Sequence, residues 1–421
     1  MRLLFINRYF YPDISATAQL LTELAEDLDE RGDHITVITG NTAYLGGEAR
    51  LPAREMHHGI RILRVGFTRF GRSHTLGRLA DYLSFWLCAF WAAVRMKDQD
   101  CLVVLSDPPL LSVFAVIVRI FRPIKTVCWL QDVFPDIAIR AGVLREGLFA
   151  RFLRGVARWS LSRMDQVVVI GRCMERYLLS QGLPAHRLIN ISNWADGRHL
   201  RPAPRADNEF LRQHGLADRF VVMYSGNHGV VHDVDTMIAL IRETSSIPRL
   251  CFCFVGEGVW KRTLMDIAQA EGWQHVEFLP YQPKALLQSS LSAADIHLVT
   301  LQAGMEGLSI PSKAYGILAV GRPMIFIGPP GSETALIVRE GEFGYGVPPG
   351  DTKGAVRALL AAYSDHSLLE KQGQAASRYF NTHCDRSIAT EQFRQMLQHV
   401  AVPSSTQPAP LRSVSPPTGS P

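Results

Sequence analysis

The sequence has no hydrophobic run long enough to cross a bilayer. Its longest apolar stretch, residues 82–94, falls well short of the roughly 20 residues that a transmembrane helix needs. The first residues read as a strand, and they lack the apolar core and small-residue cleavage site of a secretory signal. We therefore expect a soluble, cytoplasmic protein.

An excess of charge of one sign is also missing. Lys and Arg total 44 and Asp and Glu total 39, which gives a formal net charge of +5. So small an excess over 421 residues is not the basic stripe of a dedicated nucleic-acid binder. It suits an anionic small molecule or an anionic membrane surface, and it specifies neither.

The familiar nucleophile, zinc and P-loop motifs do not occur. There is no P-loop, no G-x-S-x-G and no H-E-x-x-H sequence. The seven cysteines are an odd number and lie mostly in apolar runs, which predicts buried thiols in a reducing compartment. Cys251 and Cys253 share one strand face, but no second Cys or His pair stands at ligand spacing, so they do not predict a metal site. His228 and His232 do not predict one either, because Gly229 lies between them and a third ligand is lacking.

Short apolar runs alternate with helical periodicity along the chain, the pattern of parallel sheets covered by helices. The length allows two or three domains, and the pattern favours two. We expect strands at residues 3–7, 34–39, 60–65, 102–105, 125–130 and 166–170, and then at 220–224, 250–255, 276–279, 296–298, 324–327 and 345–347. We expect helices that include residues 18–31, 259–271 and 311–320.

The Pro-rich segment 201–208 is the best linker between the two halves. The fold class is therefore α/β, with two Rossmann-like doubly wound domains that face each other across a cleft between the carboxyl edges of their sheets. Residues 402–421 are rich in Pro, Ser and Thr, which predicts a disordered tail.

Three strand-to-helix turns in the second half carry candidate ligand-binding residues. Gly226 and Asn227 follow one strand, and Glu257 stands between two glycines after the next. Ser309, Ser312 and Lys313 bring hydroxyls and a cation to the start of a helix, with Pro311 near its first position, a plausible diphosphate cradle. A tight turn without a ligand and an ordinary capped helix are the alternatives.

In the first half, Gln131 and Asp132 come directly after an apolar strand. Asp132 could accept a proton from an attacking hydroxyl or hold a sugar hydroxyl. A capping carboxylate before Pro135 is the competing interpretation, and near-normal turnover of Asp132→Asn would favour it. Asp233 and Asp235 suggest helix capping rather than a D-x-D metal pair.

Two apolar helices near the middle of the first half are open to two interpretations. Residues 82–94 and 110–121 are apolar nearly all round and are followed by Arg and Lys. The default interpretation is a packed core. The alternative is contact with a bilayer surface.

Together, these segments resemble the retaining glycosyltransferases of family 4, which have the GT-B fold. The likeness is greatest to the bacterial branch of exopolysaccharide, colanic-acid and O-antigen (lipopolysaccharide) assembly, and it runs from Met1 to about residue 400. Its landmarks are residues 7–12 (NRYFYP), 131–136 (QDVFPD), 193–196 (NWAD), 224–227 (YSGN), 255–258 (VGEG), 293–295 (AAD), 310–313 (IPSK) and 318–323 (LAVGRP).

The resemblance implies a hexosyltransferase-class enzyme that moves a sugar from a nucleotide-sugar donor, with retention, to a saccharide or polyprenyl-diphosphate-linked acceptor. It implies no metal or other cofactor, no nucleic acid, and peripheral contact with the cytoplasmic face of the inner membrane. The implied divisions are an acceptor-binding domain at 1–198, a nucleotide-sugar-binding domain at 199–377, a helix returning to the first domain at 378–401, and the tail.

The resemblance also assigns residues. Gly226, Asn227, Ser309, Ser312 and Lys313 would approach the diphosphate, while Glu257 and Tyr281 would also belong to the donor site, with Tyr281 facing the base. Ala16 and Thr17 would close over the donor from the other domain. Gln131 and Asp132 would lie near the reacting carbon.

The sequence departs from this family at two places. Asn227, His228 and His232 stand where many members bind the donor with Arg and Lys. Of the usual pair of glutamates seven residues apart, only Glu306 is present, and Lys313 follows it. These departures leave a catalytically silent binding protein of the same fold as one alternative. An epimerase or hydrolase of nucleotide sugars is the other, because the same two-domain cleft can release or isomerise the sugar.

Overall fold

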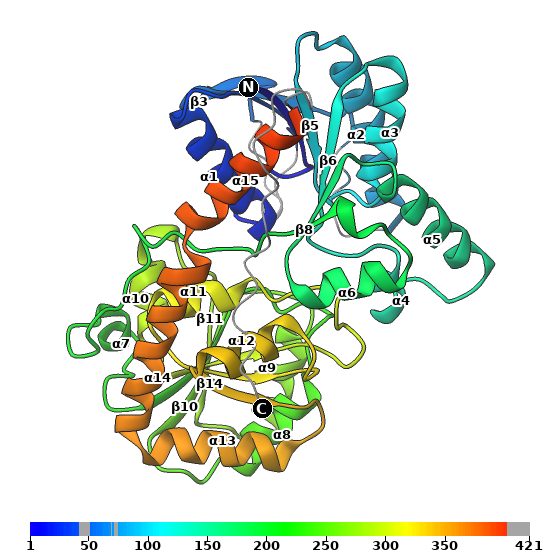
Figure 1. Cartoon of the computed structure of the whole chain (residues 1–421). Helices are drawn as coiled ribbons and strands as arrows, with labels where there is room; N and C mark the ends of the chain where they lie inside the picture. The colour runs from blue at the N-terminus through cyan, green and yellow to red at the C-terminus, as the bar shows by residue number, and fades with distance from the viewer. Residues whose placement is uncertain (42–50, 69, 71–74, 402–421) are drawn as a thin grey trace, which may run out of the picture. The chain divides into compact units, whose positions relative to one another are not determined.

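The computed structural model describes residues 1–41, 51–68, 70 and 75–401. The predicted disordered tail at 402–421 lies outside these residues. The chain forms two compact units, each an α/β sheet with helices on both faces (Figure 1). Of the described residues, the first unit comprises those within 1–134, 151–192 and 390–401, and the second comprises residues 135–150 and 193–389.

The first unit is built on an eight-stranded sheet in the order β3-β4-β2-β1-β5-β6-β7-β8. All neighbouring strands pair in parallel except β3 and β4, which form an antiparallel hairpin. The strands are β1 (Arg2–Ile6), β2 (His34–Gly40), β3 (Arg54–His57), β4 (Ile60–Val65), β5 (Cys101–Val104), β6 (Lys125–Trp129), β7 (Gln166–Val169) and β8 (Leu188–Asn190).

Helices cover the first sheet on both faces, with α1 and α15 on one side and α2 and α3 on the other (Figure 1). Helix α1 begins after Ser15, and its leucines at positions 20, 21, 24 and 28 are buried, which is the amphipathic pattern expected for a helix on a sheet. The helices whose residues lie mainly in this unit are α1 (Ala16–Glu30), α2 (Thr75–Arg95), α3 (Leu111–Phe121), α5 (Leu148–Leu161), α6 (Arg172–Ser180), η1 (Ala185–Arg187) and α15 (Arg386–Ala401).

The six strands expected in this half are all present, within one or two residues of the predicted ends. The parallel strands are buried on both faces, so their sequences read as continuous apolar runs. Strands β3 and β8 are missing from the prediction. The reason is that β3 is a polar, half-exposed edge hairpin and β8 is only three residues long.

The second unit has a six-stranded parallel sheet in the order β11-β10-β9-β12-β13-β14. Counted from β9, this is the 3-2-1-4-5-6 order of a dinucleotide-binding fold, and its switch point lies between β9 and β12. The strands are β9 (Phe220–Ser225), β10 (Leu250–Val255), β11 (Val276–Leu279), β12 (Ile296–Thr300), β13 (Met324–Ile327) and β14 (Gly344–Val347), which is all six expected from the sequence.

The helices of the second unit pack against both faces of this sheet. Phe252 and Phe254 point to one face, while Cys251 and Cys253 point to the other, so alternate residues of β10 enter two different core clusters. The helices are α4 (Asp136–Arg140), α7 (Glu209–Gln213), α8 (Asp235–Glu243), α9 (Lys261–Ala270), η2 (Lys284–Leu286), α10 (Leu287–Ser292), α11 (Lys313–Ala319), α12 (Glu333–Gly341), α13 (Thr352–Ser364), α14 (His366–Tyr379) and η3 (Phe380–Cys384).

The chain leaves the second unit through a tight polar junction. Asp196 accepts hydrogen bonds from Arg198 and Arg386, and Ala195 pairs with Asp385 in an isolated bridge. Burial opposes ionisation of Asp196, but the bonds from Arg198 and the charge of Arg386 hold its pKa well below the usual value. From Thr390 on, α15 belongs to the first unit, where Phe393 contacts Trp129 with ring centroids 4.7 Å apart.

All seven cysteines are free thiols, and six of them are buried, as the sequence predicts. Burial raises the pKa of Cys128 and of Cys251 to about 12, which makes both thiols poor nucleophiles. The pair Cys251 and Cys253 belongs to no cluster of potential metal ligands among the described residues.

Candidate active site

Two glycine turns interlock at the carboxyl ends of β9 and β10. The backbone N–H of Gly226 donates to the carbonyl of Val255, and that of His228 donates to the carbonyl of Glu257, both at 2.9 Å. Gly226 and Gly256 have φ of 124° and 129°, a conformation that favours glycine. A Cβ on Gly256 would lie 2.1 Å from the carbonyl oxygen of Gly226, so only glycine fits there.

Lys313 reaches this turn from the other side of the switch point. It is the first residue of α11, after β12, and its Nζ lies 3.5 Å from the carbonyl oxygen of Asn227. The same Nζ lies 3.5 Å from the centroid of the Tyr224 ring, a close cation–π contact. Burial lowers the pKa of Lys313 well below its usual value, so an anion bound here would strengthen its charged form.

Two histidines lie beneath the first turn in an aromatic cluster. The ring of His228 stacks on Tyr224 at 5.1 Å and packs against Trp260 at 4.3 Å between centroids. His232 holds its Nδ1 2.7 Å from the carbonyl oxygen of Thr300, so Nδ1 carries the proton. Burial and then the nearby Lys313 lower the pKa of both histidines to about 3. The two rings are therefore neutral at physiological pH, and they form no metal cluster with other described residues.

The lowered pKa values of these two histidines predict how the free energy of unfolding depends on pH. An unfolded chain protonates them near pH 6.5, whereas the folded protein does so only near pH 3. The unfolded state thus binds more protons between these values, and the free energy of unfolding should fall as the pH is lowered through this range. His275 and His297 also have lowered pKa values and act in the same direction.

Urea unfolding at neutral pH and at about pH 5 measures this effect. His228→Phe keeps an aromatic ring against Trp260 and removes one titrating group, so its transition midpoint should change less with pH than that of the wild type. An identical pH dependence in both proteins would contradict the assignment of His228.

Glu257 and Tyr281 lie together beside the second turn. The hydroxyl of Tyr281 is 3.5 Å from the carbonyl oxygen of Glu257. Lys261, the first residue of α9, donates from its Nζ to Gly256 O at 2.7 Å, to Glu257 Oε1 at 2.8 Å and to Leu279 O at 3.1 Å. The sequence analysis does not select Lys261 as a site residue. Its position five residues after Gly256, at a helix start, is the signal that could have found it.

Ser309 and Ser312 are half-buried on the segment between β12 and α11. Ser312 is the residue before the helix, and its side chain makes no capping hydrogen bond. Pro311 precedes it, so the predicted position of Pro311 at the start of the helix is wrong by about two residues. The structure thus brings Gly226, Asn227 and Lys313 into one group at the switch point, with Glu257 and Tyr281 beside the neighbouring turn.

The other predicted residues belong to the first unit. Ala16 and Thr17 open α1 after β1, next to the switch point between β1 and β5 of this sheet. Gln131, which is buried, and Asp132, which is half-buried, follow β6, and the backbone N–H of Gln131 donates to Ser106 Oγ at 3.2 Å. All four therefore lie on chain segments that leave the carboxyl edge of the sheet, where ligands of this fold class bind.

Arg8 is a further residue at this edge that the sequence analysis does not select. It follows β1, it is buried, and its guanidinium lies 3.5 Å from an oxygen of Asp81. The guanidinium carbon also lies 4.7 Å from the centroid of the Tyr82 ring. A buried arginine at a strand end is a candidate anion-binding group, but its carboxylate partner is equally consistent with a structural role.

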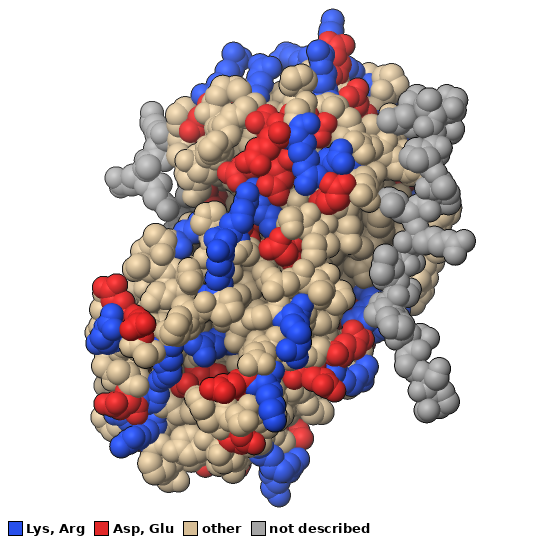
Figure 2. All heavy atoms as spheres, turned by 60° about the vertical axis from the view of Figure 1, so that its left-hand side comes forward, with Lys and Arg blue, Asp and Glu red and all other residues tan. Residues whose placement is uncertain are grey.

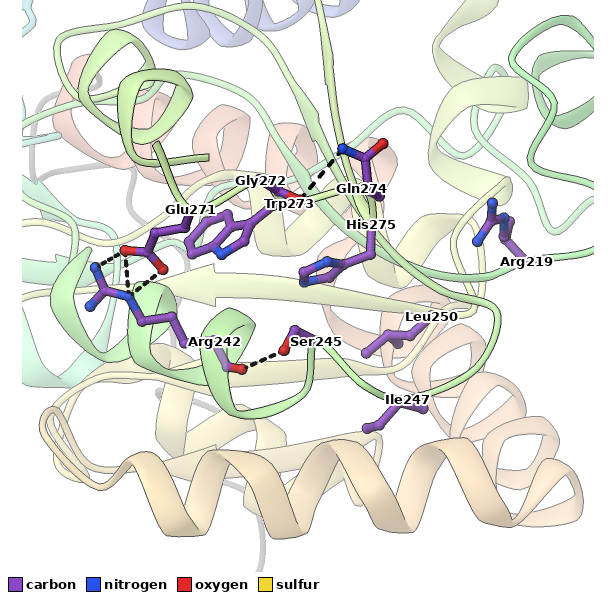
Figure 3. A pocket seen from close by; sticks show the side chains of 10 residues that line it. All are labelled: Arg219, Arg242, Ser245, Ile247, Leu250, Glu271, Gly272, Trp273, Gln274 and His275. Atoms are coloured by element: carbon purple, nitrogen blue, oxygen red, sulfur yellow. Dashed lines mark hydrogen bonds and ion pairs between the residues drawn. The ribbon is translucent and has the colours of Figure 1, made fainter. Parts of the chain in front are cut away.

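A hollow of about 730 Å³ lies at the opposite edge of the second sheet. Arg219, Leu250 and His275, which stand at or just before the starts of β9, β10 and β11, contribute to its lining (Figure 3). Figure 3 also shows the ion pair of Arg242 with Glu271 at one end of the hollow. Because the candidate donor residues follow the carboxyl ends of these strands, this hollow is not part of their site.

Charged side chains of both signs are interspersed over the described part of the face in Figure 2. That face shows no continuous basic stripe of the kind that binds nucleic acid. Near the candidate site, Lys313 and Lys261 stand at two helix starts, and Lys261 forms an ion pair with Glu257 at 2.8 Å.

Comparison with known proteins identifies the class. Residues 16–194 match the family described as Glycosyl transferase 4-like domain, and residues 207–379 match Glycosyl transferases group 1. Together with the two doubly wound units and the lysine and glycine group at the second switch point, these matches show that the chain belongs to the glycosyltransferases of GT-B fold.

More specific relatives include proteins of bacterial polysaccharide assembly. The chain is 29% identical over 295 residues to the protein named glycosyltransferase WbjE of Pseudomonas aeruginosa, with 70% of this chain and 74% of that protein covered. It is 25% identical over 406 residues to the protein named colanic acid biosynthesis glycosyl transferase WcaI of Escherichia coli, with 93% and 98% covered.

Solved structures with the same fold include two chains at 16% identity. Sucrose-phosphate synthase of Thermosynechococcus elongatus superimposes with a TM-score of 0.78 over 94% of this chain and 98% of its own. Anabaena HepE in complex with UDP-glucose gives 0.71 over 94% and 99%. The predicted α/β class and GT-B fold are confirmed.

Proposed function

We propose that this glycosyltransferase transfers a hexose from a nucleoside-diphosphate sugar, with retention at the anomeric carbon, to an acceptor in bacterial cell-surface polysaccharide biosynthesis. The observation that carries the proposal is the close approach of Lys313 to the glycine turn at Gly226 and Asn227. The names of the relatives WbjE and WcaI support the pathway, and the UDP-glucose bound to HepE supports the donor class.

The second unit is the proposed donor site. A glycine turn that lets a ligand approach the backbone closely and an ammonium group at a switch point suit the two phosphates of such a donor. When the sugar leaves, negative charge grows on the diphosphate, and Lys313 stabilises it without having to reorganise. Glu257 and Tyr281, beside the second turn, would contact the nucleoside, with Ser309 and Ser312 adding hydroxyls.

The first unit is the proposed acceptor side. Gln131 and Asp132 would hold or deprotonate the acceptor hydroxyl whose oxygen forms the new bond to the anomeric carbon as the bond to the phosphate oxygen breaks. Ala16 and Thr17 would cover the donor from this unit. No residue in this scheme needs a metal, so the reaction should proceed without one.

A thermal-shift panel of nucleoside diphosphates and nucleotide sugars, with and without EDTA, tests the proposal. One nucleotide family should raise the melting temperature by mass action, and EDTA should not abolish the rise. Adding the matching donor with a saccharide acceptor should give a glycosylated product, while the donor alone should give little beyond slow hydrolysis. No shift with any nucleotide would favour a silent binding protein, and rapid sugar release or isomerisation without acceptor would favour the epimerase or hydrolase alternative.

We further propose that helices α2, α3 and α5 contact the membrane surface, which suits a polyprenyl-diphosphate-linked acceptor. Leu79, Leu83, Leu87 and Trp91 are all exposed, and their spacing of four places them along one face of α2. Further exposed apolar side chains of the first unit lie on the other two helices: Ile120, Phe121 and Phe152.

Arginines accompany this apolar surface. Arg122, the residue after α3, donates from its guanidinium to the carbonyl of Val94. Arg119 donates to the carbonyl of Arg163 and forms an ion pair with Asp165 at 3.3 Å. An exposed apolar surface with arginines at its border suits the headgroup region of an anionic bilayer. No helix among the described residues has both the length and the apolarity to cross a membrane.

Vesicle cosedimentation tests the membrane contact. The double variant Leu83→Ser and Leu87→Ser should bind anionic phospholipid vesicles at least about tenfold more weakly than the wild type, because two apolar side chains no longer enter the bilayer. Leu360→Ser, which alters an exposed leucine of α13 in the second unit, is the matched control and should bind like the wild type. Equal binding of all three proteins, or no binding of the wild type, would contradict the contact.

A further inference from the structure

A cluster of potential metal ligands lies in the first unit, on residues that the proposed transfer reaction does not use. Glu26 of α1, His57 at the end of β3 and His58 in the β3–β4 turn each offer one ligand atom, and these atoms all lie within 4.8 Å of one another. Among the described residues no other three such side chains meet this condition. Two imidazoles and one carboxylate are a donor set suited to a borderline transition metal rather than to Mg²⁺ or Ca²⁺.

The distance between two of these atoms fits a bound ion. His57 Nε2 lies 3.3 Å from Glu26 Oε1. Zinc bonds to nitrogen and oxygen are about 2.0–2.1 Å long, so neighbouring ligands of a tetrahedral site are about 3.3–3.4 Å apart. The two atoms thus already have the separation of a ligand pair. His58 is exposed, so its ring can rotate toward the ion without displacing core side chains.

The surroundings hold the turn in place. The ring of Tyr11 stacks on His57 with centroids 3.6 Å apart and planes 15° from parallel. Asp29, one helical turn after Glu26, accepts a hydrogen bond from the backbone N–H of Gly59 at 3.2 Å and adds negative charge near the cluster.

His58 itself has φ of 49°, in the left-handed region that a residue other than glycine rarely adopts. Strained backbone of this kind tends to persist where a site requires it.

We propose that Glu26, His57 and His58 bind one transition-metal ion of the zinc type, with water in the remaining position. The ion would fasten the β3–β4 hairpin to α1 and so stabilise the first unit. This role is separate from sugar transfer, for which we expect no metal.

Cobalt titration of the tag-free full-length protein tests the proposal, because four-coordinate Co²⁺ absorbs visible light far more strongly than the hydrated ion. One equivalent of Co²⁺ should give this absorption, and Zn²⁺ should abolish it by displacement. Each of the variants Glu26→Gln, His57→Gln and His58→Gln should weaken binding at least about tenfold. Zn²⁺ should also raise the melting temperature of the wild type but not of His58→Gln.

The control is His366→Gln in the second unit. His366 is exposed and lies 3.4 Å from Glu370, so it forms a similar His–Glu pair without a third ligand. The His366→Gln variant should bind Co²⁺ like the wild type. Wild-type protein that leaves Co²⁺ in its hydrated form would overturn the proposal and leave His57 and Glu26 as a hydrogen-bonded pair. Undiminished binding by folded His58→Gln, which alters only an exposed side chain, would overturn it as well.

Discussion

Replacing Lys313 with alanine should lower kcat for sugar transfer by about 10²- to 10³-fold, the usual effect of losing one group that stabilises charge in the transition state. The ammonium lies against the glycine turn, 3.5 Å from both the Asn227 carbonyl oxygen and the Tyr224 ring centroid. In Lys313→Ala the departing diphosphate would lose the ammonium group beside the glycine turn. Initial rates with the donor identified by thermal shift measure the effect.

Two controls separate this role from a general loss of charge or of fold. Lys353→Ala removes an exposed lysine of α13 and should leave kcat unchanged. Lys313→Met retains the length of the side chain and should be as defective as Lys313→Ala. If either Lys313 variant turns over at close to the normal rate while remaining folded, the proposed donor site is wrong.

Gly256→Ala should lower the free energy of unfolding of the second unit by about 2–4 kcal/mol and weaken nucleotide binding with it. The added Cβ would meet the carbonyl oxygen of Gly226 at 2.1 Å, and the residue would still need φ of 129°. Backbone cannot move aside as a flexible side chain can, so the two turns would have to separate. Urea unfolding and a nucleotide titration measure the two effects.

Matched glycines distinguish the steric effect from the conformational one. Gly272 has φ of 66° with no atom within 4 Å of a Cβ, so Gly272→Ala should cost only about 1 kcal/mol. Gly346 also has open space and no left-handed φ, so Gly346→Ala should change stability very little. A Gly256→Ala protein no less stable than Gly272→Ala would show that the turns do not interlock as described.

Most of the fold could be predicted because parallel strands are buried on both sides. Segments such as β5 and β10 are continuous apolar runs. They can be told from the segments on either side, in which apolar residues recur at helical spacing. The polar strand β3 carries no such signal, because it is the edge strand of the sheet and has a neighbouring strand, β4, on one side only. The assignment of residues 135–150 to the second unit also has no local signal, since it depends on tertiary contacts alone.

The candidate site could be predicted only in part, for a related reason. Gly226, Asn227 and Lys313 could be selected because small residues and a lysine follow strands, and parallel strands end at one edge. That Lys313 lies over Tyr224, or that Lys261 binds the second turn, depends on distances across the switch point that no local pattern encodes. The roles of Asp132, Gln131, Ala16 and Thr17 stay predictions.

The return of α15 to the first unit has a consequence for the construction of hybrid enzymes. Phe393 and Trp129 are both fully buried against each other, although more than half of the sequence separates them. A fragment that stops at the linker would therefore leave an indole uncovered and would tend to aggregate. In a hybrid enzyme, a splice near residue 192 therefore needs a second splice near residue 390, so that the final helix travels with the unit that it completes.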